Sequence, residues 1–114
     1  MDDNKKILSL VETNYPHKEA VEARLAIGLK RYGHGIRVED DTTQWGTKKD
    51  SWLEMGLEEI DDLVIYIAAA ICKEVQNGMQ SGSLDKVWST EFNEILKTLS
   101  GVREQLSSLI ESGE

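Results

Sequence analysis

Apolar residues recur every three or four positions along most of the chain, which is the spacing of a helix face and not of a strand. Four segments carry this spacing, and they predict helices over residues 3–12, 16–31, 51–76 and 84–111. The single proline, Pro16, suits the first turn of the second helix, where its missing N–H would have no partner in any case. Few segments alternate apolar and polar residues, so we expect an all-α fold.

The third predicted helix has a clear beginning and a single apolar side. Ser51 and Glu54 form a capping box, with Asp50 as an alternative cap, and Gly78 is the stop signal. The apolar side consists of residues spaced four and three apart: Leu53, Leu57, Ile60, Val64, Ile67 and Ile71. Such a stripe predicts packing against a neighbouring helix.

The last predicted helix carries the longest heptad pattern of the chain. Its apolar positions again alternate between spacings of four and three: Trp88, Phe92, Ile95, Leu99, Val102, Leu106 and Leu109. A strict register of this length is typical of bundle and coiled-coil helices. We therefore expect one helical domain over residues 1–114, like a four-helix bundle with a long C-terminal heptad helix, and oligomeric.

Residues 32–49 interrupt the helical pattern. This segment has no apolar period and contains Gly33, Gly35 and Gly46 beside a polar cluster. It is about 18 residues long, and loops of that length in compact domains are usually functional or mobile. We therefore expect a functional loop.

The composition excludes several classes of protein. The chain has 114 residues, a net charge of −8 and one cysteine, Cys72, so it can form neither an intrachain disulfide nor a zinc site built on cysteines. The acidic balance argues against nucleic-acid and anionic-membrane partners. The longest apolar run is about half a membrane span, and the sequence opens with no signal peptide. We expect a cytoplasmic protein.

Most of the negative charge lies at the start of the third predicted helix. Residues 50–62 hold six acids and no base, and five of the acids fall opposite the apolar stripe: Glu54, Glu58, Glu59, Asp61 and Asp62. Acids three or four residues apart repel one another on a helix. Further along, the same side becomes apolar, which predicts a helix buried all round from Leu63. Acids beside a buried region need a counter-charge such as Mg²⁺, whereas a plain solvated surface is the alternative.

A basic stretch precedes the acids. Residues 23–38 contain no acid, and they include Lys30, Arg31, His34 and Arg37 in and around a glycine-bearing tetrad, 32–35. Lysine and arginine are natural phosphate partners, so these residues are candidates for binding a metal-bound phosphate ester. Alternatively, Lys30 and Arg31 only complement the end of a helix. Trp45 could stack on a nucleobase, whereas we expect Trp52 to be core packing.

The segment from Ser51 to Tyr66 resembles a motif of the all-α nucleoside triphosphate pyrophosphohydrolases, the MazG-like superfamily. Glu58, Glu59 and Asp62 match the pattern E-E-x-x-D, which an apolar run follows. The resemblance implies a helical homo-oligomer, a dimer or tetramer, that uses Mg²⁺ to cleave a nucleoside triphosphate to a monophosphate and pyrophosphate. It implies that Glu59 and Asp62 are metal ligands and that Glu58 is a ligand or the catalytic base.

The family places a second acidic motif, E-x-x-E, on a neighbouring helix. Glu19 and Glu22 provide the upstream match, although 36 residues separate Glu22 from Glu59, which is longer than the usual gap. Glu91 and Glu94 provide a downstream alternative in reversed order. We prefer Glu19 and Glu22 as the additional metal ligands.

Two functions from different classes are compatible with these patterns. The first is an Mg²⁺-dependent nucleotide pyrophosphohydrolase whose substrate is a nucleotide. The second is a non-enzymatic acidic helical module, or an oligomeric interaction protein, that docks a basic surface or a partner helix. Only the first predicts that the acids of the third helix bind a divalent cation.

Overall fold

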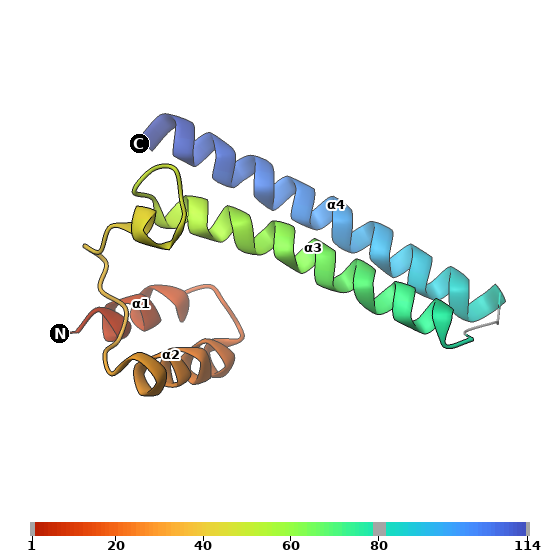
Figure 1. The fold of residues 1–114 in the computed structure, drawn as a ribbon, viewed down its shortest axis with the longest axis horizontal. Coiled ribbons are helices and arrows are strands. Elements are labelled where there is room, and N and C mark those ends of the chain that lie inside the picture. The colour runs from red at the N-terminus through yellow and green to blue at the C-terminus, as the bar shows by residue number, and fades with distance from the viewer. Residues whose placement is uncertain (1, 79–81, 114) are drawn as a thin grey trace. The chain divides into compact units, whose positions relative to one another are not determined.

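A computed structural model describes residues 2–78 and 82–113, which form four α-helices and one short 3₁₀ helix (Figure 1). The elements are α1 (Asp3–Val11), α2 (Lys18–Tyr32), η1 (Thr42–Trp45), α3 (Trp52–Gln76) and α4 (Gly82–Gly113). No strand occurs in these ranges, so the predicted all-α class is confirmed. The chain divides into two compact units, residues 1–40 and 41–114, and each is described by itself.

The first unit is a pair of short helices, α1 and α2, that pack against each other. α2 begins at Lys18 and not at Pro16, because the backbone of His17 is not helical (φ −105°, ψ 46°). The helix ends at Gly33, whose φ of 78° is the left-handed conformation that glycine adopts without strain. The Gly33 N–H donates to the Leu29 carbonyl at 2.9 Å, which closes the last turn.

The second unit is a hairpin of two long antiparallel helices, α3 and α4, preceded by η1 (Figure 1). Ser51 caps α3 as the sequence predicts, since its Oγ accepts a hydrogen bond from the Glu54 N–H at 3.1 Å. All six residues of the predicted α3 stripe are half-buried. This agrees with a stripe that faces α4.

The face that α4 turns towards α3 agrees only in part with the predicted stripe, of which Trp88, Phe92, Leu99 and Leu106 are half-buried. Ile95, Val102 and Leu109 are exposed, whereas Leu96 is half-buried and Ile110 is buried. The less exposed face is therefore turned around the helix relative to the predicted stripe, because Leu96 and Ile110 lie one residue, or about 100°, beyond Ile95 and Leu109. Heptad spacing alone does not show which edge of the stripe meets the neighbouring helix. Ile95, Val102 and Leu109 lie on the exposed flank.

The prediction that α3 is buried all round from Leu63 is wrong for the single chain. Ile65 and Tyr66 are 60% and 66% exposed, and Cys72 is also exposed. A two-helix hairpin covers only one side of each helix, so the remaining apolar side chains stay on the surface. Among the described residues Ile110 is the only buried apolar one. No helix in the described ranges is both long and apolar enough to cross a bilayer.

Candidate functional site

The acids of α3 lie on its first three turns. Glu54, Glu58 and Asp62 follow one another at intervals of four residues along the helix, and Glu59 lies beside them, three residues before Asp62. We call these four residues the acidic row. Glu58 and Glu59 are exposed, whereas Asp62 is half-buried. No Lys or Arg in the described ranges forms an ion pair with Glu54, Glu58, Glu59 or Asp62. The row is therefore an uncompensated concentration of negative charge.

Asp61 stands apart from this row because α4 supplies its counter-charge. Arg103 holds the Asp61 carboxylate with two hydrogen bonds, from Nε at 2.9 Å and from Nη2 at 3.1 Å. This bidentate pair lowers the pKa of the Asp61 carboxyl, chiefly through the hydrogen bond from Arg103. A basic partner therefore exists for one of the five acids, on a helix where sequence spacing could not reveal it.

Glu54 is the acid with the most unusual surroundings. Its Oε2 atom is buried and has no hydrogen-bond partner among the described residues. A buried carboxylate oxygen without a donor is costly, because its hydration has been lost and not replaced. A cation bound at this end of the row would remove that cost. The sequence placed Glu54 in the acidic cluster, but it gave no reason to single it out from the others.

A polar knot, formed by Thr42, Thr47, Lys49, Asp50 and Ser51, fixes the chain just before α3. The Ser51 N–H donates to Thr42 Oγ1 at 2.7 Å, and Thr47 Oγ1 donates to the Lys49 carbonyl at 2.5 Å. The Thr42 hydroxyl also lies 3.2 Å from the Lys49 carbonyl oxygen, to which it can donate, and 2.8 Å from the Thr47 hydroxyl, a contact in which either hydroxyl can be the donor. The Asp50 carboxylate accepts from the Thr42 N–H at 3.0 Å. Thr42 is completely buried, so the knot is a rigid base for α3.

Trp45 lies at the end of η1, next to this knot. Its ring packs against that of Trp52, with centroids 5.7 Å apart and planes tilted by 42°. Trp52 is half-buried, whereas Trp45 is 48% exposed. Trp45 therefore keeps aromatic surface on which a flat ligand could stack. Lys48 and Lys49, exposed in the same short loop, are cations that the sequence analysis did not select.

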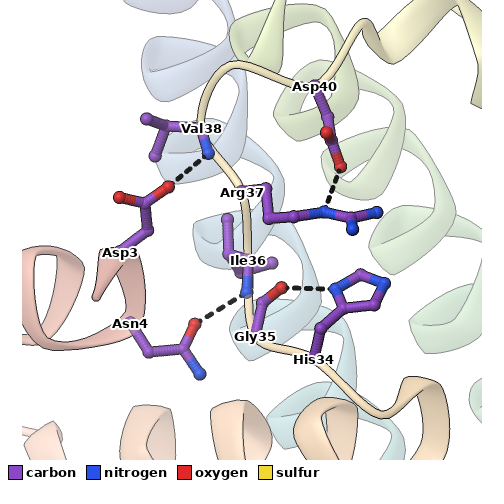
Figure 2. A network of polar contacts seen from close by, with 8 residues as sticks. All are labelled: Asp3, Asn4, His34, Gly35, Ile36, Arg37, Val38 and Asp40. Carbon is purple, nitrogen blue, oxygen red and sulfur yellow. Dashed lines mark hydrogen bonds and ion pairs between the residues drawn. The ribbon is translucent and has the colours of Figure 1, made fainter.

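The predicted anion-binding residues lie in the first unit. Lys30 and Arg31 are exposed in the last turn of α2, where they complement the negative end of the helix dipole. Arg37 Nε is 3.1 Å from an Asp40 carboxylate oxygen, and His34 Nδ1 is 2.7 Å from the Gly35 carbonyl oxygen (Figure 2). Arg37 is therefore partly neutralised already, whereas Lys30 and Arg31 form no ion pair with an acid in the described ranges.

The backbone N–H groups after the glycine tetrad are also engaged. The Ile36 N–H donates to Asn4 Oδ1, and the Val38 N–H donates to Asp3 Oδ2, both at 2.8 Å (Figure 2). These two side chains of α1 hold the segment against the helix. The amides of Ile36 and Val38 are therefore bonded within the protein.

The two candidates for a second acidic motif also have different surroundings. Glu19 and Glu22 are exposed on α2. The pKa of Lys18 is raised chiefly by its hydrogen bond to Glu12, and the negative charges of Glu22 and Glu19 add to this effect. Glu91 and Glu94 are exposed on α4, and Glu94 Oε1 lies 3.6 Å from Lys97 Nζ. Glu19 and Glu22 belong to the first unit, whereas Glu58, Glu59 and Asp62 belong to the second.

No group of three or more His, Cys, Asp or Glu side chains in the described ranges is already arranged around a common cation position. The acids of α3 form a row along one helix, and a row supplies ligands from one side only. No family model, curated protein sequence or solved structure matches the chain. The functional argument therefore depends on the acidic row itself.

Proposed function

We propose that this protein is an Mg²⁺-dependent nucleotide pyrophosphohydrolase that acts as a homo-oligomer and converts a (deoxy)nucleoside triphosphate into a monophosphate and pyrophosphate. One observation supports the proposal above all others. Within the described residues, the acidic row of α3 forms no ion pair with a base, and it begins at Glu54, whose carboxylate oxygen Oε2 is buried without a hydrogen-bond donor. Carboxylate oxygens are the ligands that Mg²⁺ prefers.

In this proposal Glu59 and Asp62 would hold the metal, and Glu58 would be a further ligand or the base that accepts a proton from the attacking water. Glu54 extends the same row. Bound Mg²⁺ would neutralise the phosphate charge and lower the pKa of water. Water adds to one phosphorus atom of the α–β anhydride, and the bridging bond breaks to release pyrophosphate. Trp45, in the same unit as α3, offers a stacking surface for the base.

The alternative is a binding module that uses α3 as a solvated acidic surface. The exposure of Glu58 and Glu59 and the ion pair between Asp61 and Arg103 are what such a surface would show. The two functions differ in how they respond to Mg²⁺. A binding surface of this kind is indifferent to millimolar Mg²⁺ beyond ordinary charge screening.

The decisive experiment measures pyrophosphate release from a panel of canonical and modified nucleoside triphosphates with Mg²⁺. We expect release from at least one of them, and its loss in Glu59→Gln and Asp62→Asn. Both substitutions relieve like-charge repulsion on α3, so these variants should be at least as stable as wild type without metal. Glu104→Gln on α4 is the matched control that keeps activity. No release from any nucleotide, together with no effect of Mg²⁺ on stability, would overturn the proposal.

A further inference from the structure

One flank of α4 has no charged side chain over about five turns. Its members are exposed and recur at spacings of three and four: Ile95, Thr98, Val102, Gln105, Leu109 and Ser112. We call this row the neutral flank. Its apolar members Ile95, Val102 and Leu109 are 37%, 38% and 53% exposed. In a chain in which 30% of residues are charged, so long an uncharged exposed row is unusual for a surface that only meets water.

Covering the neutral flank would also leave its two hydroxyl groups hydrogen-bonded. The Thr98 hydroxyl donates to the Glu94 carbonyl at 3.1 Å, and the Ser112 hydroxyl donates to the Leu109 carbonyl at 3.4 Å. Both hydroxyls therefore keep a partner inside their own helix when another surface covers them. The surface of α4 beside Val102, Gln105 and Leu109 is a shallow open depression, against which a facing helix can pack.

We infer that the neutral flank of α4 is the surface through which two copies of this chain associate, with a two-fold axis passing close to Val102. A two-fold contact brings the same surface of both copies together, so any charge on it meets its like. Each copy carries a net charge of −8, so a face without acids is the one on which self-association avoids this repulsion. A basic partner protein would instead be drawn to the acidic side of the hairpin.

The spacing of the row supports an antiparallel contact. Ile95 and Leu109 each lie seven residues, or two helical turns, from Val102. A two-fold axis at Val102 therefore sets Ile95 of each copy opposite Leu109 of the other and places Gln105 near Thr98 of the other copy. The two hairpins then form a four-helix bundle, which buries the exposed apolar members of the neutral flank, Ile95, Val102 and Leu109. The inference does not depend on the proposed hydrolase activity.

Cross-linking of the full chain tests the axis. In a Cys72→Ser background the introduced thiol is the only one, and Val102→Cys should form a disulfide-linked dimer under mild oxidation because a residue on the axis meets its own copy. Ser100→Cys is the matched control, since Ser100 is exposed about 200° away around the same helix. We expect about tenfold faster cross-linking at position 102. Equal rates at the two positions would overturn the inference.

Sedimentation measures the association itself without oxidation. Wild-type chain should be dimeric at micromolar concentration, and Val102→Glu should raise the dimer dissociation constant by about tenfold or more, whereas Ser100→Glu should leave it unchanged. Both substitutions are at exposed positions, so folding is checked by helical circular dichroism. A wild-type chain that stays monomeric at high concentration would contradict the inference.

Discussion

Replacing Thr42 by valine tests whether the polar knot holds the start of α3. Valine has nearly the same shape as threonine, so the substitution removes the hydroxyl and leaves the packing intact. The Ser51 N–H, which donates to Thr42 Oγ1 at 2.7 Å, loses its acceptor in a site where Ser51 is 3% exposed. A buried donor left unsatisfied costs about 1–3 kcal/mol. We therefore expect the free energy of unfolding to fall by about that amount.

Chemical denaturation of the full chain at one fixed protein concentration provides the assay, because an associating protein has a concentration-dependent stability. Amide hydrogen exchange at Ser51 adds a local readout and should accelerate in Thr42→Val. Thr43→Val is the control, because the Thr43 hydroxyl bonds to Asp41 on the exposed side of η1. The reasoning is refuted if the two variants unfold at the same denaturant concentration and the Ser51 amide stays protected in both.

The remaining predictions concern Gly35 and Asp61. A Cβ atom at Gly35 would lie 2.7–2.9 Å from the Asn4 side-chain end, so Gly35→Ala should displace Asn4 and expose the Ile36 amide to exchange as Asn4→Ala does. Each substitution should lower the free energy of unfolding by about 0.5–1.5 kcal/mol, and the double variant should lower it by no more than one substitution alone. Additive losses in the double variant would contradict the displacement of Asn4. Arg103 lowers the pKa of Asp61 in the folded chain, so the stability that Asp61 contributes is present above the unfolded value, about pH 4, and is lost as the pH falls through the folded pKa. Urea titrations should show wild type more stable than Asp61→Asn at pH 7, with the difference reduced by salt and by acid; a difference unchanged at pH 3 would contradict it.

Local signals in the sequence were sufficient to predict the helices. The capping box at Ser51 and the stop signal at Gly78 both act over a few residues, and α3 begins at Trp52 and ends at Gln76, as these residues indicate. The six-residue stripe of α3 was also identified correctly. These features depend on spacing within one segment, which is the information a single sequence carries.

Features that depend on two segments were missed for a physical reason. Arg103 lies 42 residues from Asp61, so no helical spacing connects them, and the heptad spacing of α4 does not show that Leu96 and Ile110 are less exposed than Ile95 and Leu109. Likewise, nothing in the sequence shows that Asp3 and Asn4 occupy the amides of Val38 and Ile36. For the candidate site, the sequence indicated the acidic cluster, whereas the buried oxygen of Glu54 could be recognised only once the helix had been placed.

Calorimetric titration of the full chain with Mg²⁺ tests most directly whether the acidic row of α3 is a metal site. We predict saturable binding to wild type that is lost in Asp62→Asn and Glu59→Gln and kept in Glu104→Gln. Bound metal should also stabilise the fold, by about 2.7 kcal/mol when free Mg²⁺ is a hundred times the dissociation constant. Absence of binding to wild type, or equal binding to wild type and to both α3 variants, would contradict the account.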